Sequence, residues 1–132
     1  MLGRGLISTQ PNAAFAAVAV ERPVGIVVSG EALFLGNSAR LVALAAEHAV
    51  PTVYPIRVAT TAGGLMSYGA DPIDAGRLAA IYVGRILKGE KPENLPVQQS
   101  TKVELVINLK SAKALGLSIP LALIGRADEV IE

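Results

Sequence analysis

The run GGLMSYGADPIDAGRLAAIYVGRILKGEKPENLPV, residues 63–97, decides the fold of this chain. It reads as a short apolar strand at residues 65–68, a turn, a capped helix and an exit marked by prolines. Asp71 is the predicted N-cap, because Pro72 occupies the first helical position and Asp74 the third position of a capping-box-like pattern. Gly89 is the predicted end of the helix. The stretch is a strand–turn–helix unit without an obvious catalyst.

The predicted helix carries an apolar stripe at helical spacing, which favours burial of Ala75, Leu78, Ala79, Tyr82 and Ile86. Tyr82 is therefore expected to pack on the sheet. Tyr68 ends the strand before a glycine, and a buried tyrosine hydroxyl needs a partner. We expect Tyr68 to line a cleft and not to fill the core.

The flanking sequence predicts alternating helices and strands. Upstream we expect a helix capped by Asn12, a strand, a second helix, a second strand and a short helical turn, at residues 13–21, 24–28, 39–49, 52–54 and 57–62. Downstream we expect a strand, a short helix capped by Asn108 and a final helix, at residues 102–108, 109–116 and 121–132. This order predicts an α/β fold, a Rossmann-like and mostly parallel sheet flanked by helices.

Composition excludes several classes of protein. The 132 residues fit one domain, and the net charge of +1 comes from scattered charges, which argues against a nucleic-acid surface. The chain has no cysteine, so it forms neither disulfides nor thiolate metal sites. The first 12 residues contain no sustained apolar segment, so we expect no secretory signal and a cytoplasmic chain if it is expressed as written.

The residues that usually carry catalysis are mostly missing. His48 is the only histidine and lies on the apolar stripe of a predicted helix, which favours packing or a helix end. Ser29 lacks the G-x-S-x-G elbow of a serine hydrolase. We therefore expect no enzyme, no catalytic residue, no cofactor and no metal site.

Small and polar residues gather where the predicted parallel strands end, the edge at which open α/β sheets bind ligands. Ser29 and Glu31 follow the first strand, Arg57 follows the second, and the third ends in Ser67, Tyr68 and Gly69. This set suits a small polar or zwitterionic ligand more than a reaction. The other interpretation is that they are ordinary loop residues.

The run "TVYPIRVATTAGGLMSYGADPIDAGRLAAIYVGRILKGEKPENLPV" and the ending "RADEVIE" resemble the C-terminal part of ABC-transporter substrate-binding proteins of the type I periplasmic-binding-protein-like fold. The resemblance covers residues 13–132 and makes the chain one α/β unit. It implies a βαβ part of the second lobe over residues 1–62, a crossover strand and helix over 63–89, and a C-terminal strand and helices over 90–132.

The resemblance implies a periplasmic solute receptor that delivers a small organic or amino-acid-like molecule to a membrane permease. Ser67, Tyr68 and Gly69 match the crossover motif, and Tyr54 with Pro55 matches a strand end that faces the cleft. The expected ligand-binding residues are Ser29, Glu31, Tyr54, Arg57, Ser67, Tyr68 and Gly69.

Members of that family are two-lobed and more than twice as long, so we expect part of the first lobe to be missing here. The apolar stripe of the helix would then be exposed, and a homodimer is the simplest way to cover it. Residues 89–96, "GEKPENLP", could serve as a hinge for exchange between two copies. The alternative function is a one-lobe interaction module, or a non-functional fragment, that self-associates without binding ligand.

Overall fold

The computed structural model describes residues 13, 15–17, 20, 24–98 and 101–132. Its five strands form one sheet in the order β1-β2-β3-β4-β5. All neighbouring strands are parallel except β3 and β4, which are antiparallel. The strands are β1 (Ile26–Val27), β2 (Thr52–Tyr54), β3 (Met66–Ala70), β4 (Val103–Asn108) and β5 (Glu129–Ile131). The predicted α/β fold with a mostly parallel sheet is confirmed.

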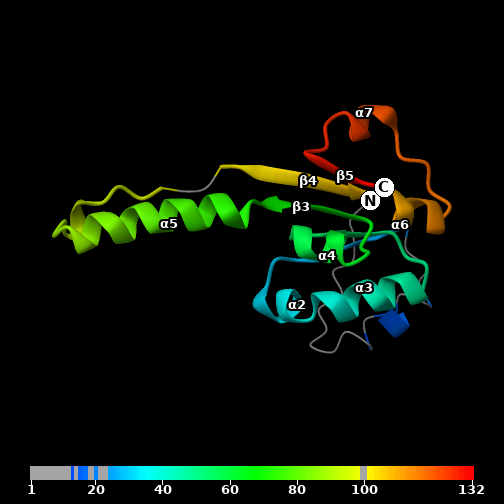
Figure 1. Ribbon diagram of the computed structural model, residues 1–132. Coiled ribbons are helices and arrows are strands. Elements are labelled where there is room, and N and C mark those ends of the chain that lie inside the picture. The colour runs from blue at the N-terminus through cyan, green and yellow to red at the C-terminus, as the bar shows by residue number, and fades with distance from the viewer. Residues whose placement is uncertain (1–12, 14, 18–19, 21–23, 99–100) are drawn as a thin grey trace.

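Helices lie on both sides of this sheet, with α3 and α4 below it and α7 above it in the view of Figure 1. The helices are α2 (Ala32–Gly36), α3 (Ser38–Glu47), α4 (Arg57–Thr61), α5 (Pro72–Leu87), α6 (Leu109–Ala114) and α7 (Leu121–Ile124), and a 3-10 turn covers Pro92–Asn94. The main core cluster lies between α3, α4 and the sheet: Phe15, Leu41, Val42, Ala45, Tyr54 and Ala59. No helix in the described part of the chain is both long and apolar enough to span a bilayer.

Most predicted elements are present. Residues 13, 15–17 and 20 are helical, as expected for the first predicted helix, whereas its predicted cap Asn12 lies outside the described residues. The Asn108 side chain caps α6 by accepting from the backbone N–H of Ser111 at 3.1 Å. Helix α2 was not predicted, because its five residues are too few to show a helical period.

The predicted final helix over residues 121–132 is wrong. Helix α7 ends at Ile124, and residues 129–131 form β5. Asp128 explains the change, since its backbone N–H donates to the Leu105 carbonyl at 2.9 Å and its carboxylate accepts from the Leu105 N–H at 2.8 Å. These bonds place residues 129–131, "EVI", against the open edge of β4, where they form a parallel strand.

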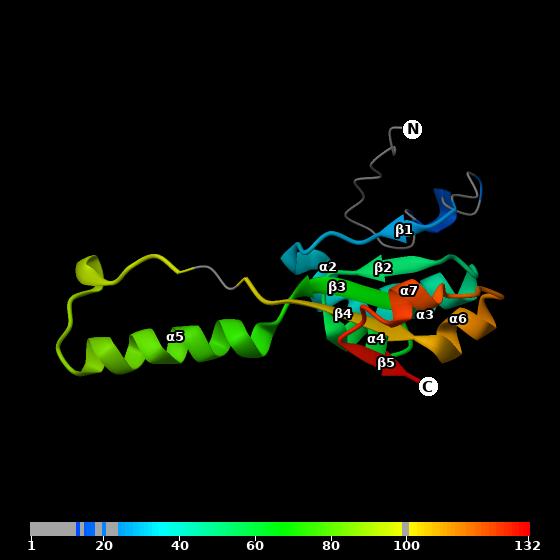
Figure 2. The same ribbon diagram turned by 90° about the horizontal axis from the view of Figure 1, so that it is seen from above.

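Helix α5 extends away from the rest of the structure in both views (Figures 1 and 2). None of its residues is buried, so the prediction of a buried apolar stripe is wrong, whereas the expectation that the stripe is exposed in this chain agrees with the structure. Ile73 is 80% exposed and Leu87 is 82% exposed. Because an isolated helix gains little from packing, α5 depends on its caps and on nearby chain for stability.

The segment after α5 folds back along it, and residues 72–98 are called the arm below. Tyr82 was predicted to pack on the sheet, which is also wrong: it is half-buried, and its hydroxyl donates to the Pro96 carbonyl. Arg85 pairs with Glu90, with 2.7 Å between Nε and Oε2. Gly89 has a φ of +94° and reverses the chain between them, as expected for a C′ glycine.

Asp71 joins the arm to the sheet, and its predicted role as the N-cap of α5 is confirmed. One carboxylate oxygen accepts from the backbone N–H of Ile73 at 2.9 Å. The other accepts from Lys102 Nζ at 2.7 Å, and the Asp71 N–H donates to the Lys102 carbonyl at 3.0 Å. The residue that starts α5 is thus bonded to the chain that returns from the arm.

We expect Asp71→Ala to loosen the first turns of α5, because the unpaired N–H groups there lose their acceptor. Hydrogen–deuterium exchange should show several-fold faster exchange at residues 73–77, with the sheet unaffected. Asn is as good a cap as Asp, so Asp71→Asn is the control that keeps most of the protection. Equal exchange in all three proteins would contradict the capping role.

A second expectation concerns pH. The Lys102 ammonium, which donates to Asp71, lowers the pKa of this carboxyl below its ordinary value of 3.8, and the Ile73 N–H adds to the effect. The ionised carboxylate therefore stabilises the fold fully above pH 3.8, and this stabilisation is lost as the pH falls through the lowered pKa. Thermal melts should show Asp71→Asn less stable than the parent at neutral pH. A difference that stays constant down to the most acidic folded sample would contradict this.

Candidate functional site

The carboxyl ends of β1, β2 and β3 meet around Pro55. A Cβ placed on Gly30, after β1, would lie 3.8 Å from the Pro55 Cβ, an ordinary contact. A Cβ placed on Gly69, in β3, would lie 2.0 Å from the Pro55 carbonyl oxygen, which no side chain can tolerate. The strand ends predicted to form a binding edge are therefore in contact, and Gly69 allows the close approach.

Three of the predicted site residues are exposed at or near this edge. Ser29 and Glu31 are both exposed. The Glu31 carbonyl accepts the first hydrogen bonds of α2, but its carboxylate makes no capping bond. Tyr68 is 62% exposed, which confirms that it does not fill the core. These side chains can offer a hydroxyl, a carboxylate and an aromatic face to a solute.

Two other predicted site residues lie in the interior. Tyr54 and Ser67 are each 2% exposed and are direct neighbours in the β2–β3 ladder. Burial raises the pKa of Tyr54 to about 12, and the Thr52 hydroxyl offsets only part of this rise. Among the described residues, the Tyr54 hydroxyl makes no hydrogen bond of normal geometry, so its interaction with Thr52 is weak. A solute at this edge can therefore contact fewer side chains than predicted, because Tyr54 and Ser67 are part of the core.

Arg57 begins α4 and is engaged by two carboxylates of the protein. One guanidinium nitrogen lies 2.9 Å from Glu104 Oε1 on β4, and the other pairs with Glu129 on β5. The hydrogen bond to Glu104, followed by the charge of Glu129, raises the pKa of Arg57 above its ordinary value. Arg57 is near the predicted site but is already paired.

Sequence analysis missed Glu104, Glu129 and Lys102 as neighbours of this edge. They follow the arm in the chain and reach the edge only through the antiparallel β3–β4 pairing, in which Gly69 faces Glu104. The alternation in "KVELVIN" places Glu104 on the same face as Val106 and could have singled it out. Its pairing with Arg57 could not have been predicted without knowing the β3–β4 register.

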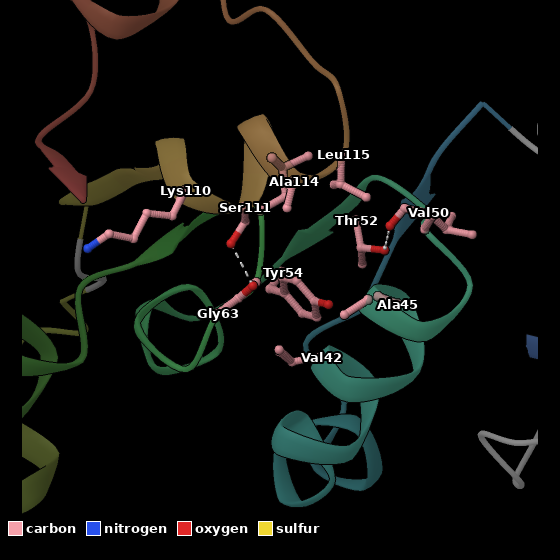
Figure 3. Close-up of a pocket in the computed structure, with 14 residues that line it drawn as sticks. Val42, Ala45, Val50, Thr52, Tyr54, Gly63, Lys110, Ser111, Ala114 and Leu115 are labelled. Atoms are coloured by element: carbon pink, nitrogen blue, oxygen red, sulfur yellow. Dashed lines mark hydrogen bonds between the residues drawn. The ribbon is translucent and has the colours of Figure 1, made fainter. Parts of the chain in front are cut away.

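A cavity of about 340 Å³ lies at the opposite end of the strands (Figure 3). Tyr54 lies in it near Val42 and Ala45, and the Ser111 hydroxyl donates to the Gly63 carbonyl at its side. Most of the remaining lining is aliphatic: Ala46, Ala49, Val50, Leu65, Ala114 and Leu115, with Thr52, Gly64 and Lys110. This cavity contains none of the predicted site residues other than Tyr54.

The single histidine has a structural role. His48 is the C-cap residue of α3 and stacks on Phe15 with ring centroids 5.9 Å apart, which agrees with a packing or helix-end role. Among the described residues, no group of three or more His, Asp or Glu side chains is placed to hold a metal ion.

We expect Gly69→Ala to destabilise the fold by about 1–3 kcal/mol, because the added methyl group would force β3 away from Pro55. Urea unfolding measures the change. Gly30→Ala is the matched control, since its added carbon would make only an ordinary 3.8 Å contact with the same proline. Similar unfolding midpoints for the two variants would show that the Gly69 contact does not constrain the edge.

Comparison with known proteins places this geometry in a family. The family model for ABC transporter substrate binding proteins matches residues 10–131. No curated protein gives a match. A conserved domain protein from Vibrio cholerae is 28% identical with a TM-score of 0.82, over 91% of this chain and 40% of that one. An ABC domain from Streptococcus pneumoniae, solved with L-Trp, is 27% identical with a TM-score of 0.78, over 92% of this chain and 43% of that one.

A third structure supports the fold alone. It is a ligand-free, open substrate-binding protein with adhesive properties from Clostridium difficile, 19% identical with a TM-score of 0.59, over 99% of this chain and 43% of that one. This chain thus spans less than half the length of each of these structures. The family match over nearly the whole chain, together with the shared sheet, shows that the chain belongs to the ABC transporter substrate-binding protein family.

Proposed function

We propose that this chain forms part of the solute receptor of an ABC transporter and holds a small organic or amino-acid-like molecule at the carboxyl ends of β1, β2 and β3. One observation carries the proposal. The exposed ring of Tyr68 stands next to Gly69, where the three strand ends meet around Pro55. An edge of this kind is the usual ligand site of an open α/β sheet.

The exposed side chains suit a zwitterionic solute with an apolar part. The Tyr68 ring offers a face for stacking, and aromatic pairs contribute about 0.5–1.5 kcal/mol beyond the area they bury. The Glu31 carboxylate is available to an ammonium group, and Ser29 can donate to a carboxylate. Tyr54, Ser67 and Gly69 shape the edge from behind. The L-Trp bound in the Streptococcus pneumoniae structure supports an amino acid with a ring as the first probe.

The same proposal covers the transport partners. A receptor of this family works outside the cytoplasm and passes its solute to a membrane permease, so we assign this chain an extracytoplasmic location and a permease partner. No catalytic step is part of the proposal. The arm leaves the sheet directly after the proposed site (Figure 1).

L-Trp should raise the melting temperature of the chain, because a ligand that binds only the folded state stabilises it, by about 2.7 kcal/mol at 100 times its Kd. We expect Tyr68→Ala to weaken binding by roughly tenfold, through loss of the stacking face. Tyr68→Phe is the control that keeps the ring. The chain contains no tryptophan, so fluorescence of the added L-Trp can report binding directly.

Two outcomes would contradict the proposal. One is the absence of stabilisation by L-Trp and by a panel of other amino acids and small organic acids. The other is equal L-Trp affinity in the parent and in Tyr68→Ala, which would place the solute elsewhere.

The second candidate function is a self-associating module that binds no solute. The observation in its favour is α5, whose apolar side chains are uncovered: Ile73, Ile81, Val83, Ile86 and Leu87 are all exposed. A homodimer would cover them, with residues 89–96 as the hinge through which the region after Gly89 is exchanged between the two copies. Light scattering separates a monomer of 13.6 kDa from a dimer. A dimer that no solute stabilises would favour this candidate over the first.

A further inference from the structure

The ion pairs of Arg57 connect helix α4 with two strands of the sheet, β4 and β5. Arg57 starts α4, directly after β2, and its partners Glu104 and Glu129 lie on β4 and β5. The sheet order places β3 between β2 and β4, and α4 packs against both β3 and β4, so Arg57 makes these contacts from a helix that lies on the sheet. One side chain therefore joins three elements that are far apart in the sequence.

Gly69 is the residue of β3 that lies beside Glu104, one of the two partners of Arg57. It pairs with Glu104 in the β3–β4 register, so both residues point to the same face of the sheet. The Pro55 carbonyl approaches Gly69 on this face as well, two residues before Arg57. The missing side chain at Gly69 leaves room for the proline. Tyr68 precedes Gly69 and points to the opposite face.

Arg57, Glu104 and Glu129 form a charged cluster whose positive charge is already paired, so it offers little to an anionic ligand. The Arg57 side chain is 42% exposed, but its two terminal nitrogens already contact carboxylates of the protein. A solute carboxylate would have to displace Glu104 or Glu129 to form a paired contact. The cluster also holds two negative charges for one positive charge, which disfavours an added anion.

We propose that Arg57 is a positioning residue of the solute site. It fastens α4 to β4 and β5 beside Gly69, and it thereby fixes the segment that presents Tyr68. This inference depends on the proposed function only for the location of the solute; the fastening itself follows from the ion pairs.

Hydrogen–deuterium exchange of the solute-free chain tests the fastening. We expect Arg57→Met to raise exchange at residues 68–71 and 103–105 by about tenfold, a change in local opening that corresponds to one hydrogen-bonded ion-pair network. Glu104→Gln and Glu129→Gln should each raise it less, and Arg57→Met with Glu104→Gln should equal Arg57→Met alone. Arg57→Lys should restore part of the protection. Arg126→Met is the control for loss of charge, because Arg126 is exposed and forms none of the ion pairs found in the described residues.

L-Trp titration then separates positioning from contact. A positioning role predicts that Glu104→Gln and Glu129→Gln weaken L-Trp binding in step with their faster exchange. A direct contact predicts that these two variants, which release the guanidinium, keep or strengthen binding, while Arg57→Met loses it at unchanged exchange. That second pattern, or unchanged exchange in Arg57→Met, would overturn the inference. If the parent binds no L-Trp, the proposed function is in doubt, but the exchange experiment still decides the role of Arg57.

Discussion

The contact between Gly69 and the Pro55 carbonyl is the constraint on which the candidate site depends. It brings the end of β2 against β3, sets the path of α4, and places Arg57 where it can reach β4. A side chain at position 69 would overlap the Pro55 carbonyl oxygen and force β3 away from the end of β2. A close-packed interior has little room for such a shift. Tyr68 precedes Gly69 in β3, so its side chain points to the opposite face of the sheet, where it is exposed.

Local signals allowed much of the fold to be predicted. Asp71 and Asn108 were recognised as caps from residues within one helical turn, and β2 and β3 from short apolar runs beside glycine or proline. The exception at the C-terminus has a physical cause. Residues 129–131 have the composition of either a helix end or a strand, and the open edge of β4 decides the outcome through Asp128. Tertiary contacts of this kind override local preference.

The sequence predicted which segments meet at the proposed binding edge, but not how their side chains are oriented. The rule that ligands bind at the carboxyl ends of parallel strands selected segments that are in contact with one another. Whether a polar side chain at such an edge faces solvent or the interior depends on strand register, which sequence does not give. Tyr54 is buried for that reason, and Tyr68, the tyrosine that ends the next strand, is exposed. The partners of Arg57 could not be predicted either, because Glu104 lies 47 residues away in the sequence and only the strand register brings it close.

In the arm, the apolar periodicity predicted the helix α5 correctly but did not predict that its apolar side chains are exposed. The stripe on α5 is real, but periodicity identifies a face that needs a partner, not the partner itself. In this structure the nearest substitute is the returning chain, through the bonds of Tyr82 and Arg85, and it leaves most of the stripe uncovered. Asp71 and Lys102, which flank the arm, bond to each other, and Arg57 joins helix α4 to β4 and β5. The base of the arm is therefore held by the β3–β4 backbone ladder and by charged groups, with little apolar packing. High salt should weaken the charged part of this attachment before it affects the core.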